Sequence, residues 1–331
     1  MRNIPESLIS QAPEGLALSS PRQPDQDPAA IYLASLSEGS RRTMRAALNK
    51  VARLLGVDPR RNGQHEVTCH YCRWEAVRRD HVATIRTHLL VTYAPSTVNK
   101  HLSAIRGALR AAYDLDQMDS EDYHQAVTVE SVSSQPQPVG RLLSNDEIHA
   151  LLQACVEDPT PAGARDAAMI ALWAVAGPRR AEIVNLDLRD YDKHSGAVRI
   201  RRNRGQTGRT IYIADGAQQA MDDWIAIRGE ARGPLFVPIH HSGKMRISRM
   251  TPQAAYTILR KRASETGVEN VSPHDLRCTA LINLIDKTDL STAQQIAGHA
   301  DPKTTARYDQ RGEQAKRDAA AAMDLSYPGG G

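Results

Sequence analysis

Imidazole, guanidinium and phenol side chains recur in the second half of the chain at spacings that suit chemistry on phosphate. His274 and Arg277 stand three residues apart, behind a Ser272-Pro273 pair of the kind that caps and starts a helix. This spacing places both side chains on one helix face, beside the free N–H groups and the positive end of the helix dipole. An isolated pair of this kind is usually a capping histidine next to a surface arginine, so the motif alone does not establish an anion site.

Two further fragments place a basic side chain just after a helix-ending glycine. Gly177-Pro178-Arg179-Arg180-Ala181-Glu182 follows an apolar helix, and Gly298-His299 closes another. Tyr308 lies nine residues beyond His299 on the next short helix. Each fragment also has an ordinary explanation as a helix terminator, a surface arginine or a partly buried tyrosine.

Arginines crowd a β-hairpin predicted from the strands 197–200 and 210–213. Its basic residues are Arg199, Arg201, Arg202, Arg204 and Arg209. No acidic residue lies between Arg199 and Ile213, so the cluster cannot be neutralised locally and favours phosphate. Taken alone, the hairpin leaves nucleic-acid contact and a merely soluble hairpin open as alternatives.

In this order, the fragments resemble the tyrosine recombinase (phage integrase) family of site-specific DNA recombinases. The match runs from G-x-R-x-x-E through an arginine-rich hairpin and H-x-x-R to G-H followed by tyrosine, and it extends over residues 27 to 310. The catalytic side chains that the resemblance implies are Arg179, Arg204, His274, Arg277, His299 and Tyr308. It further implies strand cleavage through a 3′-phosphotyrosine link with a free 5′-hydroxyl, without ATP, metal or another cofactor.

The physical roles of these residues fit the resemblance. Two guanidinium groups, Arg179 and Arg277, can neutralise the charge of a pentacoordinate phosphorus. Tyr308 would be the nucleophile, and because a phenol has a pKa near 10 it needs a proton acceptor, for which His274 is the candidate. His299 would donate to a phosphate oxygen.

The hairpin tip departs from the family pattern. Members usually carry a lysine there, within G-K-G, that protonates the leaving 5′-oxygen, whereas this chain has Asn203-Arg204-Gly205. A guanidinium rarely gives up its proton. Arg204 could act as an electrostatic clamp, Lys244 could reach in, or the protein could be a slow or catalytically impaired member.

The elements that must position these groups are mainly helical. Apolar stripes at helical spacing are Met44–Leu55, Trp74–Leu89 and Val98–Ala112, followed by helices expected at about 215–228, 252–266, 273–286, 290–297 and 302–308. The predicted domains are a disordered arm (1–25), a helical core-binding domain (26–125), a linker (126–140), a catalytic domain (141–312) and a tail (313–331) that the family resemblance makes a candidate for docking on a neighbouring subunit. The predicted fold is mainly α with a small β-sheet, forming a two-domain, C-shaped DNA clamp.

Composition sets limits on the class of protein. The chain has 331 residues, 41% of them hydrophobic and only one Phe, so its cores must be aliphatic and fit helices. The net charge of +4 does not by itself announce a nucleic-acid partner. The longest apolar run, 167–177, is too short for a membrane span, and four cysteines are too few for a disulfide framework. We expect a cytoplasmic protein.

The clamp is expected to grip double-stranded DNA from two sides. The predicted phosphate contacts are Lys100, Arg106 and Arg110 in the first domain, and Arg199, Arg201, Arg202 and Arg209 in the second. The resemblance implies a homo-tetramer assembled on two duplexes, in an enzyme of the type that serves mobile genetic elements. Three alternatives are a type IB topoisomerase, a DNA-binding protein that has lost cleavage, and a phosphodiesterase, although the last lacks a metal-binding carboxylate cluster.

Cysteines and histidines of the first domain raise the question of zinc. Cys69 and Cys72 have His65 and His81 nearby, but a structural zinc site usually shows a clear second ligand pair. We expect no metal, and assign Cys69 and Cys72 to helix packing or a turn.

Overall fold

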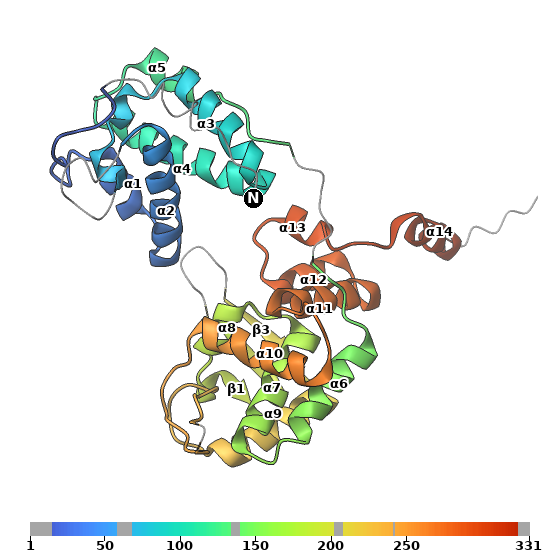
Figure 1. The fold of residues 1–331 in the computed structure, drawn as a ribbon. Coiled ribbons are helices and arrows are strands. Elements are labelled where there is room, and N and C mark those ends of the chain that lie inside the picture. The colour runs from blue at the N-terminus through green and yellow to red at the C-terminus, as the bar shows by residue number, and fades with distance from the viewer. Residues whose placement is uncertain (1–14, 58–67, 134–139, 202–207, 241, 324–331) are drawn as a thin grey trace, which may run out of the picture. The chain divides into compact units, whose positions relative to one another are not determined.

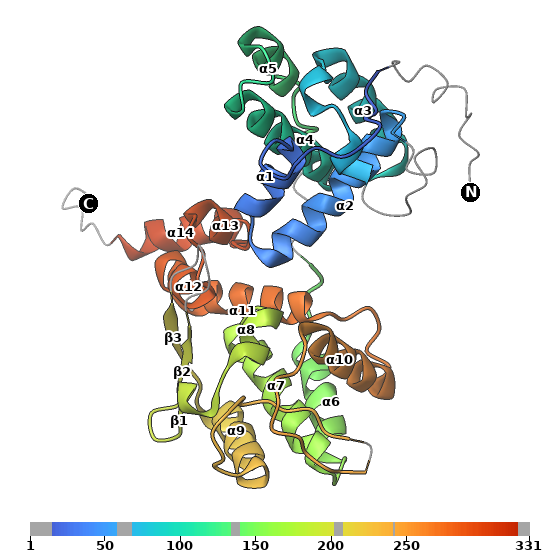
Figure 2. The ribbon, with the colours of Figure 1, turned by 90° about the vertical axis from the view of Figure 1, so that its left-hand side faces the viewer.

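The chain forms two compact units, Met1–Gln137 and Pro138–Gly331, which we call the first and second unit (Figure 1). The computed structural model describes residues 15–57, 68–133, 140–201, 208–240 and 242–323. The predicted mainly helical fold with a small sheet is confirmed (Figure 2). Among the described residues, no helix is both long enough and apolar enough to span a membrane.

The first unit is a helical bundle around the long helix α4. Its α-helices are α1 (Pro28–Ser35), α2 (Glu38–Leu54), α3 (Arg79–Thr92), α4 (Pro95–Asp114) and α5 (Ser120–Val127). α4 buries Leu102, Ile105 and Leu109, and α2 packs Leu48 and Val51 against the same core. The apolar stripes predicted for these two helices are therefore confirmed, because a spacing of three and four residues keeps side chains on one helix face.

The stripe from Trp74 to Leu89 is not one helix, as its spacing suggested. A short 3₁₀ helix, η4 (Trp74–Ala76), comes first, and α3 begins only at Arg79. Val77 and Arg78 between them are extended, and the Arg78 N–H donates to Nδ1 of His81 at 3.0 Å, which caps the new helix. A side-chain cap thus starts a helix where apolar periodicity alone predicts continuity.

From Gly15 onward the structure also differs from the expected disordered arm of residues 1–25, whose first part lies outside the described residues. Leu16 is buried in the core of the first unit, and Ala17 forms a bridge with Cys72. The Leu18 N–H donates to the carbonyl of Tyr71 at 2.8 Å. An apolar side chain and backbone hydrogen bonds hold this segment in place despite its polar, proline-rich composition. Tyr71 belongs to the 3₁₀ helix η3 (Thr68–Tyr71).

The second unit packs its other helices around one central, largely apolar helix. The helices of this unit are α6 (Asn145–Val156), α7 (Pro161–Ala176), α8 (Arg180–Asn185), α9 (Asp215–Arg228), α10 (Pro252–Thr266), α11 (Pro273–Lys287), α12 (Leu290–Ala297), α13 (Pro302–Ala306) and α14 (Gly312–Ala322), with the 3₁₀ helix η5 (Leu188–Asp190). α7 buries Met169, Ile170 and Trp173 against α6, α9 and α11. The predicted buried helix is thus the centre of this core.

The sheet of the second unit has one strand more than the predicted hairpin. Strands β1 (Tyr191–Asp192), β2 (Ala197–Ile200) and β3 (Arg209–Tyr212) are antiparallel in the order β1-β2-β3. Ile200 pairs with Arg209, so Arg209 starts β3 at the end of the hairpin near its tip. β1 is two residues long, too short for its sequence to show strand alternation.

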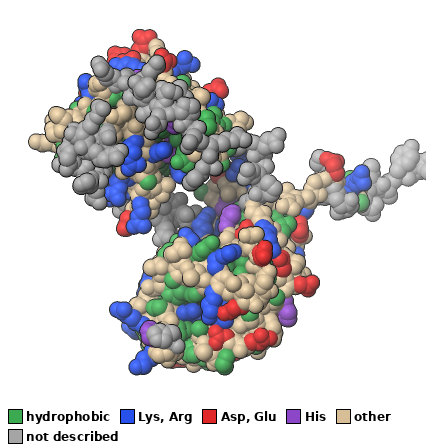
Figure 3. Space-filling model, in the orientation of Figure 1, with side chains coloured by type: hydrophobic (Ala, Val, Ile, Leu, Met, Phe, Trp, Pro, Cys, Tyr) green, Lys and Arg blue, Asp and Glu red, His purple; other side chains and the backbone are tan. Residues whose placement is uncertain are grey.

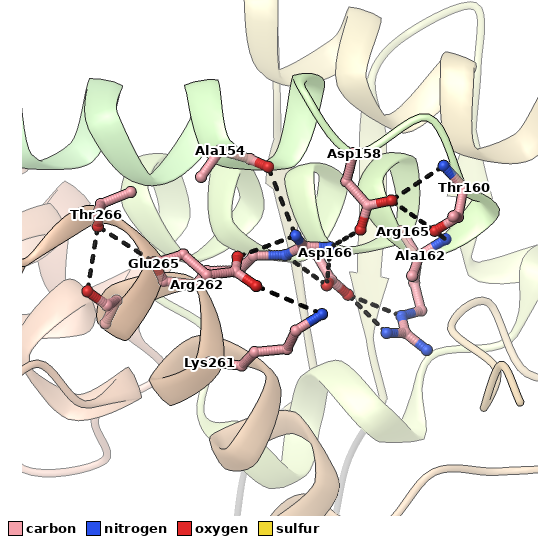
Figure 4. Close-up of polar contacts among 11 residues, drawn as sticks. Ala154, Asp158, Thr160, Ala162, Arg165, Asp166, Lys261, Arg262, Glu265 and Thr266 are labelled. Atoms are coloured by element: carbon pink, nitrogen blue, oxygen red, sulfur yellow. Dashed lines mark hydrogen bonds and ion pairs between the residues drawn. The ribbon is translucent and has the colours of Figure 1, made fainter. Parts of the chain in front are cut away.

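A buried ion network fixes α10 to the α6–α7 corner (Figure 4). Nε of Arg262 donates to Asp166 at 2.9 Å, and its Nη2 donates to Asp158 at 2.6 Å. Asp166 also accepts two bonds from Arg165, whose Nη1 reaches the carbonyl of Val237. The charges are paired on both sides, as burial at this depth requires.

Basic, acidic and apolar side chains alternate over the visible face of the second unit (Figure 3). The colours of this face therefore do not single out a binding site.

Candidate active site

The first catalytic arginine predicted from the sequence stands at a sharp turn between two helices. Gly177 ends α7 with φ +55°, a left-handed conformation that suits glycine, and Arg179 caps the start of α8. The Arg179 N–H donates to Glu182 at 2.7 Å, and its Nη1 donates to the same carboxylate at 3.0 Å. The glycine and the glutamate of the motif thus aim Arg179 away from the core, with 32% of its side chain exposed.

The H-x-x-R motif, His274 to Arg277, lies in the first turns of α11. Ser272 and Asp275 cap each other's backbone N–H groups, and Pro273 fills the first turn. This local geometry leaves His274 exposed and turns Arg277 inward. The Arg277 guanidinium donates to the carbonyls of Gly177, which caps the end of α7, and of Ala297, the last residue of α12. Burial, together with the positive charge of Arg179, lowers the pKa of Arg277 to about 10, so it stays charged at neutral pH.

Glu182 joins two arginines into one charged cluster. Both of its oxygens accept from Arg209, at 2.9 and 2.8 Å, while Oε1 also accepts from Arg179. Burial would raise the pKa of Glu182, but the hydrogen bonds from Arg209 outweigh it and lower the pKa to about 2. Glu182 is therefore a fixed negative charge, and it orients the two guanidinium groups.

Gly298 lets Arg209 pass close to the end of α12. Its φ is +64°, and a Cβ atom there would lie 2.7 Å from Nη1 of Arg209. Nε of Arg209 donates to the carbonyl of Ile296 at 2.6 Å. The glycine of the G-H motif is thus required by both conformation and close approach.

The ring of His299 has fixed partners on both nitrogens. Nη2 of Arg277 lies 2.8 Å from Nε2, and Nδ1 lies 2.9 Å from Oγ1 of Thr305. A guanidinium can only donate, so Nε2 accepts and the proton of the neutral ring is on Nδ1. Burial, together with the positive charge of Arg277, lowers the pKa of His299 to about 4. The ring is neutral at pH 7 and carries no N–H on the nitrogen that faces Arg277.

Tyr308 follows α13, not within it as predicted, because α13 ends at Ala306. Its ring stacks on that of His299 with centroids 5.9 Å apart, and the residue is only 5% exposed. Burial raises the pKa of its phenol, as does the adjacent Cys278. The candidate nucleophile is therefore held neutral.

The predicted residues meet at one cavity of about 500 Å³. Its walls include Arg179, His274, Arg277, His299 and Tyr308, from three segments that lie far apart in the sequence. Arg204, the sixth predicted catalytic residue, lies outside the described residues, as does Arg202. Lys244 lies in the loop between α9 and α10 and does not line the cavity.

Some residues of the site were missed by the sequence analysis. Arg180 and Tyr256 also line the cavity, and the Arg180 guanidinium lies 5.8 Å from the centroid of the Tyr256 ring. Thr305 accepts or donates a hydrogen bond at Nδ1 of His299, and Cys278 is buried in the same apolar cluster as Tyr308. Arg180 and Thr305 adjoin recognised motifs, but nothing in the sequence links Tyr256, on α10, to this cavity.

Several arginines predicted to contact phosphate are engaged within the protein. Arg209 is buried against Glu182, so in the free protein its guanidinium is paired with this carboxylate. Arg201 pairs with Asp187 and Asp190 at 2.8 Å each.

In the first unit, two predicted DNA contacts also have partners within the chain. Arg106 donates to the carbonyls of Val127 and Val129, which ties α4 to the end of α5. Arg110 pairs with Asp114 on the surface. Arg199 and Lys100 have side chains open at least in part to solvent.

The cysteines considered for zinc are buried in the first unit. Cys69 accepts a bond through its carbonyl from Trp74, and Cys72 sits in the bridge to Ala17. Burial raises the pKa of the Cys69 thiol to about 12. Within the described part of the chain, no group of three or more His, Cys, Asp or Glu residues is arranged to hold a metal ion. His65 lies outside that part.

Comparisons with known proteins point to one family. Residues 141–314 match the model of the phage integrase family. Tyrosine recombinase XerC of Pseudomonas aeruginosa is 30% identical over 229 residues, which are 68% of this chain and 73% of the relative. Tyrosine recombinase XerD of Listeria monocytogenes is 28% identical over 222 residues, 65% of this chain and 71% of the relative.

Solved structures share the fold at low sequence identity. XerH recombinase bound to a palindromic difH substrate aligns with a TM-score of 0.63 and 17% identity, over 92% of this chain and 99% of the other. A lambda integrase tetramer bound to a Holliday junction aligns with a TM-score of 0.62 and 15% identity, over 94% and 83%. On the strength of the family match and the XerC relative, the chain belongs to the phage integrase family and is a tyrosine recombinase, an enzyme that cleaves and rejoins DNA at specific sites.

Proposed function

We propose that the cavity beside α11 binds the scissile phosphodiester of double-stranded DNA and that Tyr308 attacks its phosphorus. The supporting observation is that Arg179, His274, Arg277, His299 and Tyr308 converge on this one cavity. The Tyr308 oxygen forms a bond to phosphorus while the bond to the 5′-oxygen breaks, which leaves a 3′-phosphotyrosine link. The reverse reaction rejoins a strand, since the bond energy is retained.

The guanidinium groups of Arg179 and Arg277 neutralise the negative charge of the phosphate. Arg179 reaches the cavity with about a third of its side chain free, and Arg277 supplies a buried charge behind it. Both are held by contacts that exist without DNA, so little reorganisation is needed as negative charge develops on the phosphate oxygens.

Proton transfers involve the two histidines. His274 is exposed at the cavity wall and takes the phenol proton. A phosphate between the arginines adds negative charge next to His299, which raises its proton affinity and turns Nε2 into a donor toward a phosphate oxygen. The leaving 5′-oxygen needs a separate donor, and Arg204 is the residue at the position where relatives have lysine.

The assembly follows from the same proposal. Residues 26–125 act as a core-binding domain and residues 141–312 as the catalytic domain, and each contacts the duplex. Arg180, stacked on Tyr256 at the cavity wall, adds a phosphate contact next to the scissile one. The XerH and lambda integrase structures contain DNA, and the latter is a tetramer on a Holliday junction. We place this chain in the same arrangement, four copies on two duplexes, acting in the cytoplasm.

The experiment that tests the proposal is capture of the covalent adduct. After the DNA site has been found by selection, Tyr308→Phe is expected to abolish the adduct. DNA affinity should stay within about twofold, because the substitution removes one hydroxyl and leaves the arginines in place. Arg179→Ala and Arg277→Ala are expected to slow cleavage at least ~100-fold, the scale of a preorganised transition-state donor. Tyr212→Phe, on an exposed tyrosine of β3, is the matched control and is expected to cleave normally. Adduct formation by Tyr308→Phe would refute the assignment.

A further inference from the structure

The imidazole of His299 lies between a side chain that only donates hydrogen bonds and one that both donates and accepts. Nη2 of Arg277 lies 2.8 Å from Nε2, and Oγ1 of Thr305 lies 2.9 Å from Nδ1. A guanidinium has no acceptor, whereas a hydroxyl has one proton and two lone pairs. Arg277 therefore requires an acceptor at Nε2, while Thr305 fits either protonation state of Nδ1.

The hydroxyl of Thr305 is shielded from solvent. Thr305 lies in α13 and is 0% exposed. In the described part of the chain, the only hydrogen-bond partner of its side chain is His299. While the ring proton is on Nδ1, the hydroxyl accepts it, and the hydroxyl's own proton then has no acceptor in that part of the chain. A buried donor without an acceptor costs free energy, so this arrangement is unfavourable for Thr305.

A phosphate in the cavity would change this arrangement. Arg277 and His299 both line the cavity, so one phosphate oxygen can accept a hydrogen bond from each of them in place of the bond between them. Because a phosphate oxygen only accepts, Nε2 must then carry the ring proton, and a neutral ring has none left on Nδ1. Nδ1 becomes an acceptor for the O–H of Thr305. The phosphate and the buried hydroxyl then both have a hydrogen-bond partner.

The surroundings of the ring favour a neutral imidazole. Burial and, after it, the positive charge of Arg277 lower the pKa of His299 to about 4. The charged groups around the ring are Arg277, Arg179, Arg209 and Glu182. The stacked ring of Tyr308 adds no charge while its phenol is protonated. A ring that donates from Nε2 and stays neutral avoids placing a further positive charge among three arginines.

We propose that Thr305 is a positioning residue that lets His299 change tautomer when a phosphate occupies the cavity, so that Nε2 donates to the phosphate while the ring stays neutral. Nε2 takes up one proton from water and Nδ1 releases one to water, so the ring gains no net charge. The hydroxyl of Thr305 changes from acceptor to donor in the same step. This inference rests on the proposed function of the cavity.

Two substitutions separate the hydroxyl of Thr305 from the shape of its side chain. Thr305→Val keeps the branched shape and removes the hydroxyl, whereas Thr305→Ser keeps the hydroxyl. The backbone carbonyl of Thr305, which accepts the Tyr308 N–H at 2.9 Å, remains in both variants. Thr279→Val is the matched control, because Thr279 is another buried threonine of the second unit, its hydroxyl donates to a backbone carbonyl, and it does not line the cavity.

Nitrogen-15 NMR of the histidine rings reports the tautomer, since protonated and unprotonated ring nitrogens resonate at different frequencies. The full chain with Tyr308→Phe is measured free and bound to the selected DNA site at pH 7, and His299→Gln identifies the signals. The ring proton should be on Nδ1 in the free protein and on Nε2 in the complex. Added Thr305→Val should lower the Nε2 population in the complex, while added Thr305→Ser or Thr279→Val should leave it unchanged.

Single-turnover cleavage by chains that retain Tyr308 gives the second readout. Thr305→Val should cleave about 3- to 10-fold more slowly, the scale of one modest hydrogen bond, with DNA affinity within about twofold of the wild type. Thr305→Ser should cleave within about twofold of the wild type, because it keeps the hydroxyl. A merely structural role of Thr305 predicts that the tautomer in the complex does not respond to the loss of the hydroxyl.

The proposal would be overturned by a ring that, in the complex, is protonated on both nitrogens or on Nδ1 alone. It would also be overturned by Thr305→Val cleaving as fast as the wild type, or by Thr305→Ser cleaving as slowly as Thr305→Val. If no adduct formed at Tyr308, the proposed function would fail. An adduct at Tyr308 with the same His299 tautomer in the free and bound states would reject only the role of Thr305.

Discussion

The arginines of the site are oriented by other residues before any DNA is present. Glu182 holds Arg179 and Arg209, and the carbonyls of Gly177 and Ala297 hold Arg277. Carbonyl oxygens at the ends of helices attract cations, because the helix dipole places partial negative charge there. The arginines of the site are thus held by fixed partners, and the groups that change protonation state in the proposed mechanism are Tyr308, His274 and His299.

His299 should titrate far below its ordinary value in the free protein and higher in the complex. Its pKa is lowered from 6.5 to about 4 by burial and the neighbouring arginines, so the unfolded chain binds the proton first and stability falls as pH drops from about 6.5 to 4. The ring signals in a histidine NMR titration of the free protein should therefore change near pH 4. In Tyr308→Phe bound to DNA, the added phosphate should raise this pKa.

A second variant tests whether the neighbouring arginines lower the pKa of His299. Arg209→Met, which removes one of the positive charges near the ring, should raise the pKa of His299 in the free protein. A His299 signal that titrates near 6.5 without DNA would contradict the fixed-charge account.

Replacing Arg204 with lysine should raise the cleavage rate. An ammonium whose pKa is lowered at the site can protonate the leaving 5′-oxygen near neutral pH, whereas a guanidinium only stabilises charge. Proton donation of this kind is commonly worth about 10²–10⁴-fold. The measurement compares a normal site with one whose 5′-bridging oxygen is replaced by sulfur, a leaving group that needs little protonation.

The substrate with a 5′-bridging sulfur shows whether the present sequence lacks a residue that protonates the leaving 5′-oxygen. The present sequence should cleave it much faster than the oxygen substrate, and Arg204→Lys should narrow that difference. Equal rates on both substrates and no gain from lysine would mean that another residue supplies the proton, and Lys244→Ala would be the next variant to measure.

At the scale of the elements, the sequence predicted helix starts and buried helix faces, which depend on residues close together in the chain. Caps such as Ser272 and Asp301, each followed by proline, gave the starts of α11 and α13, and the apolar stripe of α4 gave its buried face. The split before α3 was missed because a cap at Arg78 overrides an unbroken stripe. The ion pair between Arg209 and Glu182 was not predicted, because the two residues are 27 positions apart and strand periodicity does not reveal tertiary ion pairs.

Gly298→Ala should destabilise the protein and slow cleavage together. An alanine at φ +64° is strained, and its Cβ would meet Nη1 of Arg209 at 2.7 Å, so the pair with Glu182 must shift. We expect a loss of about 1–3 kcal/mol in the free energy of unfolding in urea. Gly216→Ala is the control, because no atom lies within 4 Å of a Cβ at this position in α9. It should leave cleavage unchanged, and equal effects of the two substitutions would reject the role of the close approach.

At the scale of the whole molecule, the two units have separate cores and the second unit contains all the described walls of the cavity. Residues 126 and 127 of the predicted linker end α5, and residues 134–139 lie outside the described part. The proposed assembly on DNA requires surfaces outside the cavity, and we expect α14 to supply one of them.

Removal of residues 312–331 should separate cleavage from assembly. Glu313, Arg317 and the residues from Ala320 to Met323 are exposed, with Met323 82% exposed, so the tail should add little to the stability of a single copy. Adduct formation on a single half-site should stay within about threefold of the full chain, because none of the tail residues that the structure describes, 312–323, lines the cavity. Recombination between two sites should be lost, because the exposed apolar side chains of Ala320 to Met323 can dock on a neighbouring copy. Sedimentation of the protein–DNA complex should show the missing tetramer, and removal of residues 324–331 alone, which keeps α14, should preserve it. If the shorter chain recombined and formed tetramers normally, α14 would have no part in assembly.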